Sequence, residues 1–277
     1  MRSLRPVLLS LLACSGLGAT SVLAAEEQLL AHRAIYELSL GTASDRSGIN
    51  AITGRMAYEF AGSQCEGYTT TFRFVMRIET DETNRLSDQQ TTTFEDSKGE
   101  TFQFVNKTYL DNALDREVKG VARADGDGTR VDLSKPQKET HTLEQTKFPV
   151  AHLKEALAKA KSGGGFYQTT LFDGSDDADT VVLTAVTIGK PRAIAEGDPE
   201  RKAAALLEDG SFWPVTIAYF ERSEERGEET PDYDISFLLH ESGVTRSLRM
   251  NYGEFSIEGR LIDLTLFEPT AGEACKP

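Results

Sequence analysis

Cysteine, histidine and tryptophan are scarce in this chain, and their scarcity excludes several kinds of chemistry. The 277 residues include 3 Cys, 4 His and 1 Trp. The four histidines are far apart and show no metal-ligand spacing: His32, His141, His152 and His240. The sequence also lacks a GxSxG elbow, a P-loop and a dinucleotide fingerprint. We therefore expect no enzymatic activity, no metal and no cofactor, and we keep an unrecognised hydrolase only as a third hypothesis.

Two acidic clusters resemble cation sites but fit simpler structures better. An EF-hand loop beginning at Asp125 would need Gly at position 130 and Glu at position 136, where the chain has Arg130 and Pro136. Asp125–Gly128 therefore predicts a hairpin turn. The second cluster follows an aromatic stretch and favours a solvated loop over a loose cation site: Asp173, Asp176, Asp177 and Asp179.

Positive charge is in short supply. The chain has 30 Lys and Arg against 44 Asp and Glu, which gives a formal net charge of −14. A strongly acidic protein repels the phosphates of nucleic acids and of anionic lipid head groups. We therefore expect no nucleic-acid partner.

Long apolar runs are also lacking, apart from a short one near the start of the chain. Arg2 and Arg5 precede the apolar stretch 6–13, and Val22–Ala24 supplies small residues for cleavage. A membrane anchor would need about 20 apolar residues, and the polar residues of Ser10–Ser21 interrupt the run. We predict a secretory signal peptide at residues 1–24, one domain at residues 25–277 and no transmembrane span.

Cys14 bears on both the signal sequence and the cysteine pairing. Residues 11–14 resemble a lipobox, so a lipoprotein signal is the alternative to simple cleavage near Ala25. If Cys14 is removed with the signal peptide, Cys65 and Cys275 remain. An even number of cysteines in an exported chain indicates a disulfide. The alternative is two free thiols, although neither has a CxxC or histidine neighbour.

Alternating side chains indicate a mainly β, antiparallel protein. In Tyr68–Ile78 the even positions are nearly all apolar and the odd positions mostly polar, which is typical of a half-buried strand. Asp81–Asp88 predicts a polar turn. So many short strands imply an open barrel, a sandwich or a coiled sheet. Further strands are predicted at Ala34–Leu40, Arg55–Phe60, Thr91–Glu95, Thr101–Val105, Val118–Arg123, Arg130–Leu133, Phe166–Phe172, Val181–Ile188, Trp213–Phe220, Tyr233–Leu239, Val244–Tyr252 and Phe255–Phe267.

One segment has the pattern of an amphipathic helix. Pro149 can begin a helix, strong helix formers follow to Lys161, and Gly163–Gly165 ends it. One face of this helix carries Val150, Leu153 and Leu157. A helix this short is marginal alone, so we expect these three side chains to pack on an apolar surface.

Several short motifs, in order along the chain, resemble the EipB family of periplasmic cell-envelope integrity proteins. They are Cys65–Gly67, then Phe148, Pro149 and His152, then Leu171–Ser175, then Trp213–Val215, and finally Thr230–Phe237 and Gly243–Phe255. Each motif is unspecific alone, but together they span nearly the whole exported chain.

The resemblance implies a large antiparallel sheet curled into a spiral or open barrel, with the helix on its concave face. It also implies a periplasmic location, a role in resistance to envelope stress, no enzymatic activity, and a disulfide between Cys65 and Cys275. We take one loop motif and an aromatic residue of another motif as a candidate interaction surface: Phe172, Asp173, Gly174, Ser175 and Trp213.

Two functions follow as hypotheses from this resemblance. The first is a non-enzymatic protein that maintains envelope integrity through contacts with another periplasmic or envelope-associated protein. The alternative is a carrier that binds a lipid or lipoprotein acyl chain in the apolar concave face.

Overall fold

The computed structural model describes residues 29–175, 177–207, 209–220 and 230–268. The predicted signal peptide and Cys275 lie outside these residues. The described part contains fourteen strands, one α-helix and two short 3-10 turns, at Asp45–Ser47 and Ala205–Leu207. The first eight strands are β1 (His32–Ala43), β2 (Ile49–Ser63), β3 (Gly67–Thr80), β4 (Asn84–Glu95), β5 (Thr101–Leu110), β6 (Ala113–Asp125), β7 (Gly128–Lys135) and β8 (Glu139–Glu144). Then follow α1 (Pro149–Lys161), β9 (Gly165–Leu171), β10 (Val182–Ile188), β11 (Phe212–Phe220), β12 (Tyr233–His240), β13 (Thr245–Asn251) and β14 (Phe255–Leu266).

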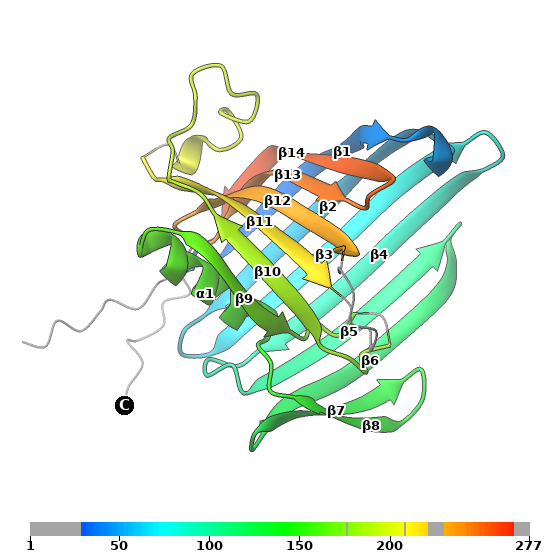
Figure 1. Cartoon of the computed structure of the whole chain (residues 1–277), viewed down its shortest axis with the longest axis vertical. Helices are drawn as coiled ribbons and strands as arrows, with labels where there is room; N and C mark the ends of the chain where they lie inside the picture. The colour runs from blue at the N-terminus through cyan, green and yellow to red at the C-terminus, as the bar shows by residue number, and fades with distance from the viewer. Residues whose placement is uncertain (1–28, 176, 208, 221–229, 269–277) are drawn as a thin grey trace, which may run out of the picture.

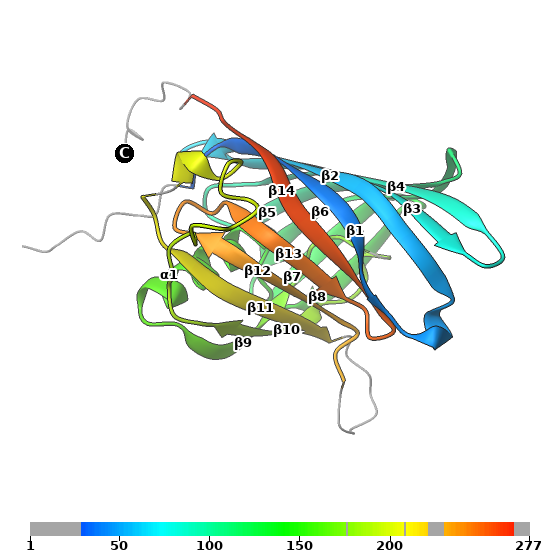
Figure 2. The same cartoon turned by 90° about the horizontal axis from the view of Figure 1, so that it is seen from above.

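All fourteen strands form one antiparallel sheet in the order β8-β7-β6-β5-β4-β3-β2-β1-β14-β13-β12-β11-β10-β9. The chain thus runs outward from β1 to one edge at β8, crosses by α1 to the other edge at β9, and returns to β14 beside β1. Figures 1 and 2 show the sheet curled so that β9–β13 lie across from β3–β6, with α1 between the two halves. The expected fold class, a curled and open antiparallel sheet with one helix on its concave face, is confirmed.

The alternation in β2 and β3 sets the register of the sheet. Met56 pairs with Phe74 and Ile52 with Ile78, so their apolar side chains share the concave face. Arg55 pairs with Val75 on the opposite, outer face. A one-residue slip would move every apolar side chain of a strand to the wrong face, so burial of one face fixes the register.

Several strands extend beyond their predicted bounds, as β2 and β6 do, and two polar segments show where the sequence prediction fails. Strand β4 begins at Asn84, inside the segment predicted as a polar turn. Gln89 is exposed on its concave face, and its neighbours there are only partly buried, so polar side chains are compatible with pairing on both sides. Strand β8 escapes prediction, because an edge strand with mostly exposed side chains has no continuous apolar face.

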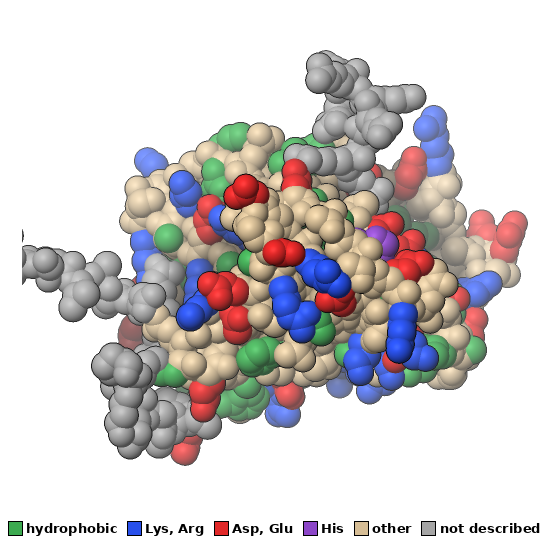
Figure 3. All heavy atoms as spheres, turned by 90° about the horizontal axis from the view of Figure 1, so that it is seen from below, with side chains coloured by type: hydrophobic (Ala, Val, Ile, Leu, Met, Phe, Trp, Pro, Cys, Tyr) green, Lys and Arg blue, Asp and Glu red, His purple; other side chains and the backbone are tan. Residues whose placement is uncertain are grey.

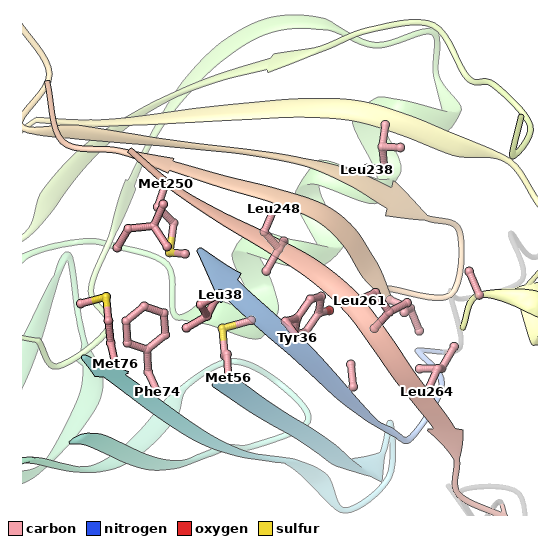
Figure 4. Packing of buried hydrophobic residues seen from close by; sticks show 14 of the residues in the cluster. Tyr36, Leu38, Met56, Phe74, Met76, Leu238, Leu248, Met250, Leu261 and Leu264 are labelled. Atoms are coloured by element: carbon pink, nitrogen blue, oxygen red, sulfur yellow. The ribbon is translucent and has the colours of Figure 1, made fainter. Parts of the chain in front are cut away.

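The largest core cluster lines the concave face where β1 meets β14. Figure 4 shows Tyr36, Leu38, Met56 and Phe74 among the residues from the β1–β3 side, with Leu248 and Leu261 from the other half. Tyr36, Leu38 and Leu261 are each 1% exposed. The protein's own side chains therefore cover this part of the concave face and exclude water from it.

Candidate functional site

Helix α1 fills a second part of the concave face. Leu157 is 0% exposed, and Val150, Ala156 and Ala160 are also buried. They pack in one cluster with Phe60 and Tyr68 of β2 and β3, and with Val186, Val215 and Leu239 of β10–β12. The helix thus joins the two halves of the sheet through its apolar face.

The three residues that are predicted to pack α1 on the sheet are not equally buried. Val150 and Leu157 are in the buried cluster, whereas Leu153 is only partly buried against it. Gly243 lies next to Leu153, since a Cβ on this glycine would be 3.6 Å from the Leu153 Cδ2. Leu157, near the middle of α1, is therefore the residue with the greatest burial on this face.

A buried carboxylate holds the N-terminus of α1. Glu95, the last residue of β4, accepts hydrogen bonds from the backbone N–H groups of Val150 (2.7 Å) and Ala151 (2.8 Å). No side chain within the helix provides this cap, because its N-cap residue is Phe148. Burial raises the pKa of Glu95 to about 7, and the two amide hydrogen bonds oppose this only in part.

A histidine on the same helix is buried and neutral. The His152 Nε2 is 3.2 Å from the Thr184 Oγ1, and that hydroxyl donates to the Thr169 carbonyl at 2.9 Å. The Thr184 oxygen is thus left to accept from the imidazole, which links α1 to β10 and β9. Burial, with a smaller effect of the Lys147 charge, lowers the pKa of His152 to about 4. These contacts give His152 a structural role at the start of α1.

Of the candidate interaction surface, the two large aromatic residues are buried, which corrects that prediction. Phe172 is 2% exposed in a cluster with Phe102, Phe104 and Phe148, and Trp213 is 6% exposed in the α1 cluster. Their apolar area is removed from water by the folded-over sheet. Phe172 stacks edge-on against Phe104, with ring centroids 5.6 Å apart.

The loop after Phe172 is likewise built into the fold. A Cβ on Gly174 would lie 2.5 Å from the Phe104 ring, so only glycine fits there. The Gly174 carbonyl accepts a hydrogen bond from the Asn106 side chain, at 2.5 Å. Asp173 is partly buried and Ser175 is exposed, so only this end of the predicted surface reaches solvent.

The cysteine pairing stays a prediction. Cys65 lies in the turn that joins β2 to β3 and is exposed there, whereas Cys275 lies outside the described residues. Within the described part of the chain, no group of three or more His, Cys, Asp or Glu side chains could hold a metal ion. No helix among the described residues is long and apolar enough to cross a membrane.

The two edges of the open sheet differ in chemistry. Strand β8 carries Glu139, His141 and Glu144. Acidic and basic side chains are also interspersed over the whole face of the molecule that Figure 3 shows from below. Strand β9 has no charged residue, and its Phe166 is 67% exposed. Charges on an edge strand discourage pairing with other chains, so β8 is protected in this way and β9 is not.

In the part of the chain that the structure describes, only the C-terminal end of β9 forms backbone hydrogen bonds with another segment along its outer edge. Lys147 bonds to it through its own N–H to the Thr170 carbonyl, and its carbonyl accepts from the N–H of Phe172. Among the described residues, no backbone hydrogen bond joins the stretch 165–169 to a strand other than β10. The edge from Gly165 to Thr169 is therefore the candidate functional site.

The sequence gives no sign of a buried ionic network between the segment before β11 and strands β13 and β14. The Arg246 guanidinium lies 2.8 Å from an Asp198 oxygen and 2.9 Å from a Glu200 oxygen, and it covers the Phe212 ring at 4.7 Å. Glu200 also accepts from the backbone N–H of Leu261, at 2.6 Å. The network fastens the segment before β11 to β13 and β14, which is a structural role.

The curled sheet and helix α1, which packs in its concave face, define a class of protein. Members of this class have an open, spiralling antiparallel sheet whose concave face is covered by one connecting helix. The family model described as EipB-like matches residues 23–268. The chain is 48% identical over 255 residues to the cell envelope integrity protein EipB of Brucella abortus (strain 2308), covering 92% of this chain and 90% of that protein. This chain belongs to the EipB-like family.

The fold is also similar to a solved structure. A crystal structure of a β-barrel-like protein of a domain of unknown function from Brucella abortus matches with a TM-score of 0.84 and 50% identity. The match covers 87% of this chain and 99% of the solved one.

Proposed function

We propose that this protein is exported to the periplasm and maintains the integrity of the cell envelope through contacts with other envelope proteins, without catalysing a reaction. The observation that carries the proposal is the 48% identity, over 92% of this chain, to a protein named for cell envelope integrity. The signal-peptide pattern at residues 1–24 agrees with export.

The filled concave face supports protein contacts over an acyl-chain carrier. A carrier needs an apolar cavity that its ligand can enter. In this protein Leu157, Tyr36 and Leu38 are almost completely buried by the chain's own side chains. Binding an acyl chain in that face would require α1 to leave, and departure would expose its buried face together with the sheet residues it covers.

The open edge of β9 supplies a surface suited to an extended protein segment. Unpaired backbone groups on an edge strand bind such a segment by adding a strand to the sheet, and neighbouring side chains give specificity. Phe166 is exposed beside those groups, on the outer face. The partner we infer is therefore a protein with an extended, partly apolar segment.

Complementation tests this proposal. Deleting the gene should make the cell sensitive to envelope-disrupting detergents, and the unaltered protein should restore resistance. Phe166→Lys should fold but fail to restore it, because a buried lysine at the interface would be unpaired. Leu114→Lys is the matched control, since Leu114 is 53% exposed on another strand. Full rescue by Phe166→Lys would show that this edge is not the working surface.

In-cell photo-crosslinking identifies what contacts the edge. A photoreactive side chain at position 166 should give one discrete protein adduct that the same side chain at position 114 does not give. Adducts of equal pattern at both positions would contradict a specific contact at β9.

A further inference from the structure

The outer face of strands β1–β4, opposite the core, carries an open hollow of about 760 Å³. Four guanidinium groups from three adjacent strands line it: Arg33, Arg55, Arg73 and Arg77. In Figure 2 no helix or loop of the described chain lies over the outer side of β1 and β2. A hollow of this size is within the range of small-ligand sites, about 300–1,000 Å³.

The floor of the hollow is apolar. Ile35, Ala57, Val75 and Leu86 supply it, and each is only partly buried. The sheet register alternates these residues with the arginines: Ala57 pairs with Arg73, Val75 with Arg55, and Leu86 with Arg77. Each arginine of β2 and β3 that lines the hollow is therefore paired across the sheet with an apolar residue. The hollow thus combines an apolar floor with a positively charged rim.

The positive charge of the rim is only partly neutralised. Arg73 forms a close ion pair with Asp88, at 2.8 Å, whereas Arg33 is 4.0 Å from Glu59. Arg77 donates to the neutral side-chain carbonyl of Asn84, at 3.0 Å.

Arg55 has no ion pair within the described part of the chain. Its cross-strand neighbour Glu37 is bonded to Arg260 instead. Of the side chains that line the hollow, none is acidic. This is unusual on a chain with a net charge of −14, and it leaves Arg55 and Arg77 available to an outside anion.

We propose that this hollow binds a lipid with an anionic phosphate head group. The forked guanidinium groups of Arg55 and Arg77 hold the phosphate, a geometry that suits paired hydrogen bonds. The hydrocarbon chain lies on Ile35, Ala57 and Val75. The site is on the outer face, so it needs no movement of α1 and is independent of the β9 edge.

Calorimetric titration of the purified protein with dodecyl phosphate, below its micelle concentration, tests the proposal. Two probes separate the parts of the ligand: dodecyl maltoside has the chain without the charge, and inorganic phosphate has the charge without the chain. We expect dodecyl phosphate to bind about tenfold more tightly than either, because charged hydrogen bonds and apolar burial both contribute. Equal affinity for dodecyl phosphate and dodecyl maltoside, or for dodecyl phosphate and inorganic phosphate, would overturn the proposal.

Variants locate the binding to this hollow. Arg55→Gln with Arg77→Gln should weaken dodecyl phosphate binding about tenfold or more. Arg249→Gln should leave it unchanged, since Arg249 is a similarly exposed arginine on β13, paired with Glu258 at 3.2 Å. Ala57→Phe should fill the floor and weaken dodecyl phosphate binding while leaving inorganic phosphate binding as it was. A double variant that melts at the same temperature as the parent and binds dodecyl phosphate with the same affinity would show that the ligand does not bind in this hollow.

Discussion

Glu95 at the end of β4 accepts a hydrogen bond of 2.7 Å from the backbone N–H of Val150, at the start of α1. The two residues are 55 positions apart in the chain, and the contact places the helix on the concave face. Glu95 is only 2% exposed, and the Val150 amide that it accepts from is itself buried. The capped helix is thus part of the fold and not a lid resting on it.

Removing the cap should destabilise the protein measurably. Glu95→Ala leaves a buried amide without an acceptor, which costs about 1–3 kcal/mol. Glu95→Gln keeps one oxygen acceptor and should lose less. Glu100→Ala, an exposed change in the same hairpin turn, should stay within about 0.5 kcal/mol of the parent. Urea denaturation measures all three, and a Glu95→Ala variant as stable as Glu100→Ala would contradict the cap.

Stability against pH should reveal two opposed titrations at the helix. Folding raises the pKa of Glu95 from 4.5 to about 7, so the folded state keeps this proton longer and the Glu95 contribution falls as pH rises between these values. Folding lowers the pKa of His152 from 6.5 to about 4, so the His152 contribution rises with pH over that window. His32 and His240, whose pKa values burial also lowers, act in the same direction as His152.

Glu95→Gln removes one of these titrations and should expose the other. We expect the free energy of unfolding of this variant to rise more steeply between pH 4.5 and pH 6.5 than that of the parent, by about 3 kcal/mol at most. Urea denaturation at intervals of pH gives the two profiles. Profiles that differ only by a constant offset would show that Glu95 does not titrate in this range.

Packing of α1 should depend on one leucine more than on its neighbour. Leu157→Ala should cost about 2–5 kcal/mol, because a fully buried side chain is lost and a cavity remains. Leu153→Ala should cost less, since Leu153 is partly exposed. Denaturation of the two variants makes the comparison, and a larger loss for Leu153→Ala would mean that α1 is rotated about its axis, with Leu153 and not Leu157 facing the core.

The predicted Cys65–Cys275 disulfide would tie the C-terminal segment to the β2–β3 turn. It would close a loop of about 200 residues, for which the chain-entropy model gives roughly 5 kcal/mol as an upper value. Replacing both cysteines with Ser should lower the melting temperature without changing the strand content. Mass mapping of the exported protein under non-reducing conditions should find the two peptides linked, and two free thiols would disprove the bond.

Local patterns in the sequence predict the elements that have local causes. Helix α1 has the bounds that the sequence predicts, because Pro149 begins it and three glycines end it. Most strands follow from alternation, which burial on one face enforces. Strand β8 and the start of β4 escape prediction because their mostly polar side chains leave no such signal.

The contacts that close the fold have no local signal. The pairing of β1 with β14 joins segments more than 200 residues apart: Tyr36 lies beside Leu261. The sequence places Glu95 at the end of a predicted strand, but nothing in the neighbouring residues indicates that its side chain is buried or that it caps a helix 55 residues away. Aromatic residues in short motifs suggest surface contacts, as at Phe172 and Trp213, yet the curled sheet buries both.

The central claim is that the protein works with α1 in place on the concave face, and a locked helix tests it most directly. A Cβ built on Gly99, in the β4–β5 turn, would lie 3.6 Å from the Ala151 Cβ, within the range for a disulfide of about 3.5–4.5 Å. Gly99→Cys with Ala151→Cys should therefore fasten the helix to the sheet. Gly99→Cys alone is the control, because φ is +69° there and a side chain costs roughly 1–2 kcal/mol.

The measurement is the detergent resistance of cells that carry the locked protein as their sole copy, with the new bond verified by mass mapping. We predict that the locked protein restores resistance as fully as the Gly99→Cys control. If the control restores resistance and the locked protein, folded and exported at the same level, does not, then α1 must leave the concave face for function and the central claim is wrong.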